Sequence, residues 1–211
     1  VPLESGDDIL AKKPSSWGDT LGAVGIDPTI EAVVCDDTIT PRVTAMFWLL
    51  EYLGHPEVSV CSEGIEGWEA SYDLTSEPTI IAEPTTSLDV AVHPTVFEPD
   101  VDGQRALQSA DDPKIDGRFS RTWVVAGESA PEGLPVDEYV QVSASDHLTE
   151  AGAMRSAWEL WTLYDDAGVG KFTEVVVASD SIAEASVNYF ALRLLGYPMV
   201  RVWMPGGGFV D

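Results

Sequence analysis

One pattern occurs twice in this chain, as "VTAMFWLLEYLGHPEVSV" at 43–60 and "ASVNYFALRLLGYPMVRV" at 185–202. The two stretches align without a gap at a numbering offset of 142. The Leu-Gly step of one then falls on the Leu-Gly step of the other, and the proline two residues later falls on a proline. Solenoid repeats are much shorter than the offset of 142 residues between these copies. The copies therefore indicate two related domains or half-domains.

Each copy has the pattern of a strand–helix–strand unit. A valine-rich run precedes each copy, "EAVVCDD" at 31–37 and "TEVVVASD" at 173–180. Such runs suit strands that are buried on both faces, as in a parallel sheet. Apolar residues at helical spacing follow, and the Gly and Pro near the end stop the helix before a second valine-rich run. The pattern predicts a parallel crossover of right-handed sense in each half.

A further helix is predicted upstream of each unit. The stretch "SSWGDTLGAVGI" at 15–26 opens with a serine that suits an N-cap, and "MRSAWELWTLYDDAGV" at 154–169 has its apolar residues at similar spacing. We place the tryptophans of these helices in the core, with a protein interface as the alternative for Trp158 or Trp161. Each half is therefore expected to read helix–strand–helix–strand.

The middle of the chain is rich in Pro, Asp and Ser, and its stretch 71–103 predicts an extended connector because proline disfavours helix interiors. Two more strands are predicted over 111–119 and 137–144. The first half has no comparable material before residue 15, so its domain is expected to be incomplete at the N-terminus. The predicted division is a partial first domain at 1–70, a connector at 71–95 and a second domain at 96–211.

The charge excludes some classes of partner. The net charge is −25, with only 11 Lys and Arg, whereas nucleic acids and anionic membrane surfaces attract clustered basic residues. The acids are scattered along a chain of ordinary apolar content, which indicates a folded protein and favours a salt-adapted source. We find no pattern of a signal peptide or of a membrane span. The cytoplasm is favoured as the compartment.

The chain resembles the tandem rhodanese family, the thiosulfate and 3-mercaptopyruvate sulfurtransferases. The resemblance is carried by "VVCDD…AMFWLLEYLGHPEVSVCSEGIEGW" at 33–68, by "VVVASDSIAEASVNYFALRLLGYPMVRV" at 175–202 and by "KIDGRF" at 114–119. It implies an α/β fold of two similar domains, each a parallel sheet flanked by helices.

The resemblance also implies where a catalytic cysteine would lie. In that family the cysteine ends the strand of the second domain and opens a loop whose N–H groups hold an anion, and its thiolate carries the sulfur. The matching position here is Ser179, and Glu184 stands where the family often has a basic residue. The whole loop comprises Ser179, Asp180, Ser181, Ile182, Ala183, Glu184 and Ala185.

This departure from the family pattern decides the functional interpretation. A serine cannot form a persulfide, and the carboxylates of Asp180 and Glu184 would repel thiosulfate. We therefore expect a catalytically degenerate rhodanese-like protein that acts as a binding, structural or assembly-subunit module for a protein partner or other subunits. The alternatives are a sulfurtransferase that moves sulfane sulfur from thiosulfate or mercaptopyruvate to a thiol or cyanide, and a hydrolase that uses Ser179 with His147. No cofactor and no metal site are predicted.

The two cysteines, Cys35 and Cys61, each end a predicted strand of the first half. Those strands are neighbours in the fold that the resemblance implies, and neighbouring strands lie within the range that a disulfide accepts. We therefore predict that the cysteines pair or lie within reach, and pairing would favour an exported protein. The alternatives are that both cysteines are small buried apolar residues, or that Cys35 is a displaced sulfur carrier.

Overall fold

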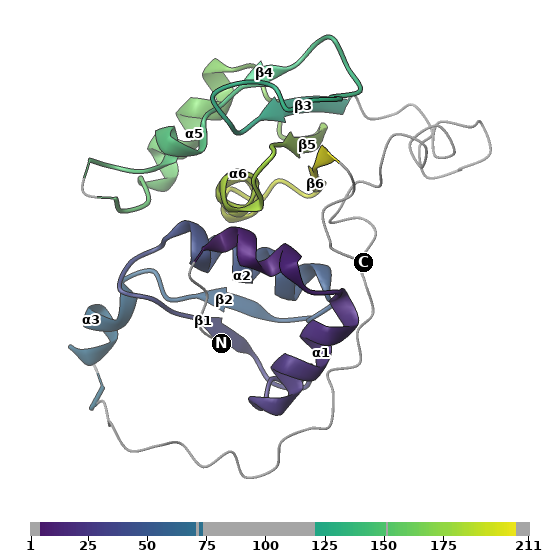
Figure 1. Cartoon of the computed structure of the whole chain (residues 1–211). Coiled ribbons are helices and arrows are strands. Elements are labelled where there is room, and N and C mark those ends of the chain that lie inside the picture. Colours follow the sequence, from purple (N-terminus) through teal and green to yellow (C-terminus); the bar gives the residue numbers. More distant parts are fainter. Residues whose placement is uncertain (1–4, 71, 74–120, 151, 206–211) are drawn as a thin grey trace. The chain divides into compact units, whose positions relative to one another are not determined.

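The computed structural model describes residues 5–70, 72–73, 121–150 and 152–205 (Figure 1). The chain divides into two compact units, one formed by residues 1–93 with 209–211 and the other by residues 94–208. The strand predicted over 111–119 and almost all of the predicted connector lie outside the described residues. Among the helices that the structure describes, none combines the length and the apolar content that a bilayer span needs.

The first unit is a small α/β structure. In chain order it contains the 3-10 helix η1 (Gly6–Ala11), α1 (Pro14–Ala23), β1 (Ala32–Val34), α2 (Pro41–Tyr52), β2 (Val58–Val60) and α3 (Gly64–Glu69). The strands β1 and β2 pair in parallel, and α2 forms the crossover between them. Its core includes Trp17, Trp48 and Leu49, none of which is more than 1% exposed. Burial of one such aromatic side chain contributes about 2–3 kcal/mol.

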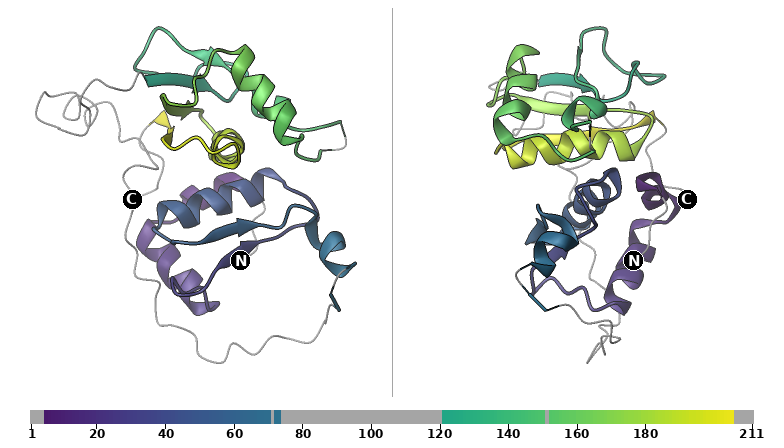
Figure 2. Two further views of the ribbon diagram at one scale, coloured as in Figure 1. Left: turned by 180° about the vertical axis from the view of Figure 1, so that it is seen from behind. Right: turned by 90° about the vertical axis from the view of Figure 1, so that its left-hand side faces the viewer.

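The second unit is built on a larger parallel sheet. In chain order it contains β3 (Arg121–Val125), β4 (Val140–Gln141), the 3-10 helix η2 (Ala144–His147), α5 (Ala157–Asp166), β5 (Glu174–Ala178), α6 (Ile182–Leu194) and β6 (Val200–Trp203). The strand order is β4-β3-β5-β6, and every pairing is parallel. The helix α6 lies along the sheet beside β5 and β6 (Figures 1 and 2). The predicted α/β class with parallel sheets and flanking helices is confirmed.

The repeated pattern corresponds to a repeated structure. When the bounds of β1, α2 and β2 are shifted by 142, they fall within about two residues of β5, α6 and β6. Both crossover helices stop at the expected glycine, Gly54 with φ of 87° and Gly196 with φ of 77°. In both, the N–H of the following residue donates to a carbonyl of the last helical turn, at 2.9 and 3.0 Å. Glycine accepts this left-handed conformation without the cost that a Cβ would add.

Three local predictions need correction. The helix α1 begins after Lys13 with Pro14 at its first position, so no serine caps it, and proline is well suited to that place because its fixed φ is helical. The strand β3 was not predicted, although "RTWVV" is a valine-rich run like the others. The strand predicted over 137–144 is shortened to Val140–Gln141.

The core assignment of two tryptophans is also wrong. Trp158 is 71% exposed and Trp161 is 38% exposed. The helix α5 buries Leu160 and Tyr164 instead, both of which are fully buried. These two residues are four apart and share one face, so the 100° step per residue places Trp158 on the opposite side of the helix.

An ion triad crosses the central strands of the second sheet. The Glu174 carboxylate on β5 accepts from Arg121 Nε at 2.7 Å and from Arg201 Nε at 2.8 Å. The three side chains are only 14 to 21% exposed. Arg121 and Glu174 face each other directly in the register of β3 and β5. The triad therefore ties three neighbouring strands together through side chains as well as through the backbone ladder.

We expect the substitution Glu174→Gln to lower the free energy of unfolding by about 3 kcal/mol, because it leaves two poorly solvated guanidinium groups beside each other. Urea denaturation measures the change. The matched control is Glu138→Gln at an exposed glutamate, which should change the free energy by less than about 0.5 kcal/mol. Equal effects of the two substitutions would contradict a stabilising role of the triad.

Candidate functional site

The candidate site is the turn that joins β5 to α6. The strand ends at Ala178, and the helix begins at Ile182 with Ser181 as its N-cap. The Ser181 hydroxyl oxygen accepts a hydrogen bond from the backbone N–H of Glu184 at 3.3 Å. The turn therefore lies at the carboxyl edge of a parallel sheet and at the N-terminus of a 13-residue helix, where ligands of open α/β sheets commonly bind.

Ser179 is buried at this turn, with 1% of its surface exposed. Its hydroxyl donates to Oε2 of Glu184 at 2.8 Å. The same oxygen accepts from the backbone N–H of Ser181 at 3.1 Å. The hydroxyl is thus engaged both as donor and as acceptor within its own loop, and it is not presented to solvent.

Glu184 supplies the negative charge of the site. It lies in the first turn of α6, where the helix dipole and the free N–H groups stabilise an anion. Gly127, which follows β3, approaches it closely, since a Cβ at that glycine would lie 3.1 Å from Glu184 Oε2. Gln141 stabilises the segment that contains Gly127, because its Nε2 donates to the carbonyl oxygens of Gly127 and Glu128 at 3.0 and 2.8 Å. The loop therefore contains an internal carboxylate at the place where an external anion would bind.

The other predicted loop residues divide into two groups. Ile182 and Ala185 are fully buried and anchor the first turn of α6 to the core, whereas Asp180 is exposed and Ala183 is half-buried. The structure thus brings Ser179, Ser181 and Glu184 together in one hydrogen-bonded group.

His147 belongs to a separate buried network. Its Nδ1 lies 3.0 Å from the carbonyl oxygen of Ser143, and its Nε2 lies 2.7 Å from the Tyr164 hydroxyl. Burial lowers the pKa of His147, which favours the neutral ring, and Nδ1 donates to the Ser143 carbonyl oxygen because that oxygen can only accept. The Tyr164 hydroxyl also lies 3.3 Å from the carbonyl oxygen of Asn188, to which it donates. Both ring nitrogens are used in this way, and Ser179 bonds elsewhere. The Ser179–His147 pair of the hydrolase alternative is not assembled.

Cys35 and Cys61 are free thiols in the structure. They directly follow the paired residues Val34 and Val60, and the N–H of Cys61 donates to the carbonyl oxygen of Val34 at 3.0 Å, so they lie on neighbouring strand ends. Burial raises the pKa of Cys35 to about 11. A thiol of that pKa is almost fully protonated at neutral pH and is a weak nucleophile, which argues against Cys35 as a displaced sulfur carrier. Within the described part of the chain, no three or more His, Cys, Asp or Glu side chains are grouped to hold a metal ion.

Comparison with known proteins supports the family resemblance. No family model matches the chain. The chain is 28% identical over 204 residues to a protein of Haloferax volcanii named "Putative thiosulfate sulfurtransferase", covering 92% of this chain and 69% of the relative. It is 26% identical over 203 residues to the thiosulfate sulfurtransferase of Gallus gallus, covering 93% and 68%.

Among solved structures, SseA from Escherichia coli, described with the rhodanese fold of 3-mercaptopyruvate sulfotransferases, superposes with a TM-score of 0.68. The match covers 93% of this chain and 73% of SseA at 19% identity. The chain has the rhodanese fold. The names of the two relatives support the resemblance to the sulfurtransferase family.

Two residues near the candidate site were not predicted from the sequence. Gly127 follows β3 and Gln141 ends β4, so both lie more than 35 residues before the loop at Ser179. A glycine at the end of a valine-rich run was the available signal for the first, because the carboxyl ends of parallel strands meet at one edge. No local pattern distinguishes Gln141 from other polar residues.

The free energy of unfolding should fall as the pH is lowered from 7 to 5. The pKa of His147 is lower in the folded protein than the unfolded value of about 6.5, so the unfolded chain binds the proton first and gains stability as the pH drops. Urea denaturation at several pH values measures this slope. The variant His147→Phe should be less stable at pH 7 by about 2 kcal/mol, having lost two hydrogen bonds, but should show a flatter slope. An unchanged slope in the variant would contradict this assignment.

Proposed function

We propose that this rhodanese-fold protein is a catalytically degenerate module that binds a protein partner instead of transferring sulfur. The observation that carries the proposal is the hydrogen bond from the Ser179 hydroxyl to the Glu184 carboxylate at the N-terminus of α6. This bond supports a loop whose polar groups are hydrogen bonded to each other. Such a loop offers neither the thiol nor the vacant anion site that sulfur transfer needs.

The chemistry of sulfur transfer explains why this matters. A thiolate attacks the outer sulfur of thiosulfate, a sulfur–sulfur bond forms, and sulfite leaves with the bonding electron pair. A buried serine hydroxyl offers no thiolate for this attack. Two unit charges 4 Å apart near a protein surface repel by about 4 kcal/mol, so the Glu184 carboxylate would also oppose a bound thiosulfate.

The alternative function is sulfur transfer from thiosulfate or mercaptopyruvate to a thiol or cyanide, and the names of the two relatives favour it. It would require one of the first unit's cysteines as the carrier. The raised pKa of Cys35 weighs against that residue.

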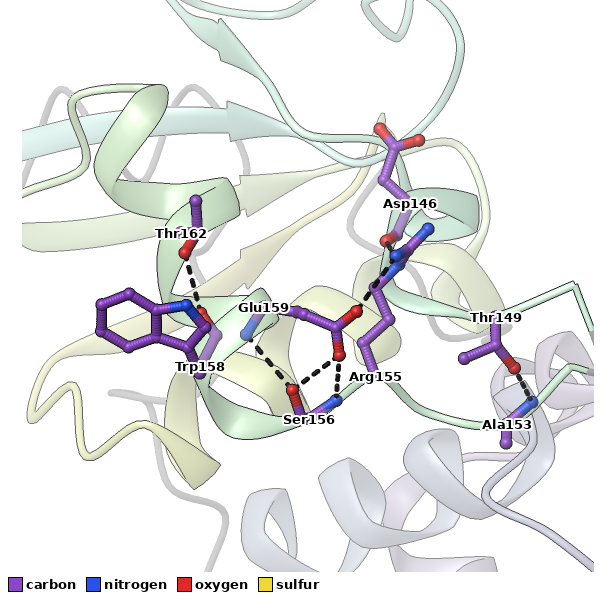
Figure 3. Close-up of polar contacts among 8 residues, drawn as sticks. All are labelled: Asp146, Thr149, Ala153, Arg155, Ser156, Trp158, Glu159 and Thr162. Atoms are coloured by element: carbon purple, nitrogen blue, oxygen red, sulfur yellow. Dashed lines mark hydrogen bonds and ion pairs between the residues drawn. The ribbon is translucent and has the colours of Figure 1, made fainter.

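The outer face of α5 supports a binding role. The indoles of Trp158 and Trp161 stack on each other with centroids 5.1 Å apart, and both are exposed. Figure 3 shows Trp158 in the first turn of α5, next to a capping box in which the Ser156 hydroxyl accepts from the Glu159 N–H at 3.4 Å and the Glu159 carboxylate accepts from the Ser156 N–H at 3.0 Å. The range Ala157–Asp166 contains three acids, of which Glu159 pairs with Arg155 at 3.6 Å, whereas Asp165 and Asp166 are exposed. Such a surface fits a protein partner that presents arginine or lysine, because cations bind over indole faces and beside carboxylates.

The sulfur-transfer test uses reduced protein, freed of reductant and incubated with excess thiosulfate, and reads the intact mass. We expect no added sulfur atom in the wild type and little in Ser179→Cys, because Glu184 keeps the new thiol protonated and repels the donor. The double variant Ser179→Cys with Glu184→Gln should gain one sulfur atom that a thiol reductant removes. Reductant-labile sulfur on the wild type would support the sulfurtransferase alternative and would overturn the proposal that the protein is catalytically degenerate.

The binding face should be dispensable for folding. We expect Trp158→Ala with Trp161→Ala to change the free energy of unfolding by less than about 1 kcal/mol, because both indoles are exposed. The matched control Trp203→Ala removes a side chain that is 1% exposed and should cost about 3–5 kcal/mol. A loss of that size in the α5 variant would mean that the chain itself covers these indoles, which would contradict a free binding face.

A further inference from the structure

The chain's only two cysteines occupy matching places on the two strands of the first unit. Val34 ends β1 and pairs with Val60, which ends β2. The ladder continues one step, because the N–H of Cys61 donates to the carbonyl of Val34 at 3.0 Å. One step further along a parallel register places Cys35 opposite Cys61.

This register brings the two side chains to the same face of the sheet. Residues opposite each other on neighbouring strands lie about 4.8 Å apart, within the Cα separation of about 4.4–6.8 Å that a disulfide accepts. Both residues are half-buried, so the two thiols are not sealed in the core. Neither strand has to move far for the sulfur atoms to meet.

We propose that Cys35 and Cys61 form a reversible dithiol–disulfide site that reacts with small disulfides of the glutathione type. Cys61, as its thiolate, attacks a sulfur of the oxidant, forms a mixed disulfide and releases one thiol. The second cysteine attacks the protein sulfur of that mixed disulfide, closes the Cys35–Cys61 bond and releases the second thiol. The protein loses two hydrogen atoms and two electrons reduce the oxidant to two thiols.

The surroundings connect this bond to the start of α3. The Cys61 thiol donates to the carbonyl oxygen of Gly64 at 3.2 Å, and oxidation removes this donor. Gly64 has a φ of +67° and packs so tightly that an added Cβ would lie 1.9 Å from the carbonyl oxygen of Asp37. The N–H of Ile65 donates to the carbonyl of Asp36 at 3.1 Å. The disulfide would therefore form next to the contacts between the loop that follows β1 and the loop that follows β2.

The experiment treats the native, reduced full chain with oxidised glutathione, then denatures and alkylates it. We expect the wild type to become two hydrogen atoms lighter, to resist alkylation and to recover both thiols after dithiothreitol. The rate should rise from pH 7 to pH 9, because the thiolate is the attacking form. The oxidised protein should also unfold at a higher urea concentration, since the bond restricts the unfolded chain.

A matched variant tests the register itself. Combining Val60→Cys with Cys61→Ser keeps two thiols but moves one of them to the opposite face of the sheet. This variant and Cys35→Ser should stop at mixed disulfides with glutathione. The proposal is overturned if the native wild type keeps two alkylatable thiols, if it stops at mixed disulfides or forms only intermolecular bonds, or if the shifted variant closes its disulfide equally fast.

Discussion

The N-terminus of α6 sets the constraint on which the second unit depends. A buried parallel strand must turn into a helix within three residues, and the first turn of that helix leaves N–H groups that need acceptors. Here the acceptors are the hydroxyl of Ser181 and the oxygen of Ser179, and Glu184 supplies the charge that the helix dipole favours. In the same geometry a thiolate and an external anion would take these roles. The groups that accept from these N–H donors therefore determine whether the turn can bind an external ligand or is filled by the chain's own side chains.

The scarcity of cations makes the placement of each one informative. With 11 Lys and Arg against 36 Asp and Glu, two arginines are committed to Glu174 in the interior of the sheet. No described cation pairs with Glu184. In the described part of the second unit, Arg121 and Arg201 thus hold neighbouring strands together through Glu174.

The sequence allowed the repeated unit to be predicted because strand, helix and glycine stop are local features with strong periodicity. The stops at Gly54 and Gly196 and the parallel pairing that they imply are of this kind. The exposure of Trp158 could not be predicted in the same way, because it depends on which face of α5 the rest of the unit covers. The Ser179–Glu184 bond lies between these cases: the spacing of five residues across a predicted turn placed both at the site, but the direction of the side chains came from packing against Gly127.

The turns that join strand to helix in the two repeats are stabilised by different interactions. In the first unit, Thr40 caps α2, and the carboxylate of Asp36 accepts from Arg42 at 2.8 Å. That acid is neutralised by an arginine, while Glu184 in the second unit is held by a serine hydroxyl and a helix dipole. Because an ion pair leaves less net charge than a hydroxyl contact, the second turn remains the more negative of the two. In the second unit the Glu184 carboxylate is thus held without a described cation, whereas both cysteines of the chain lie in the first unit.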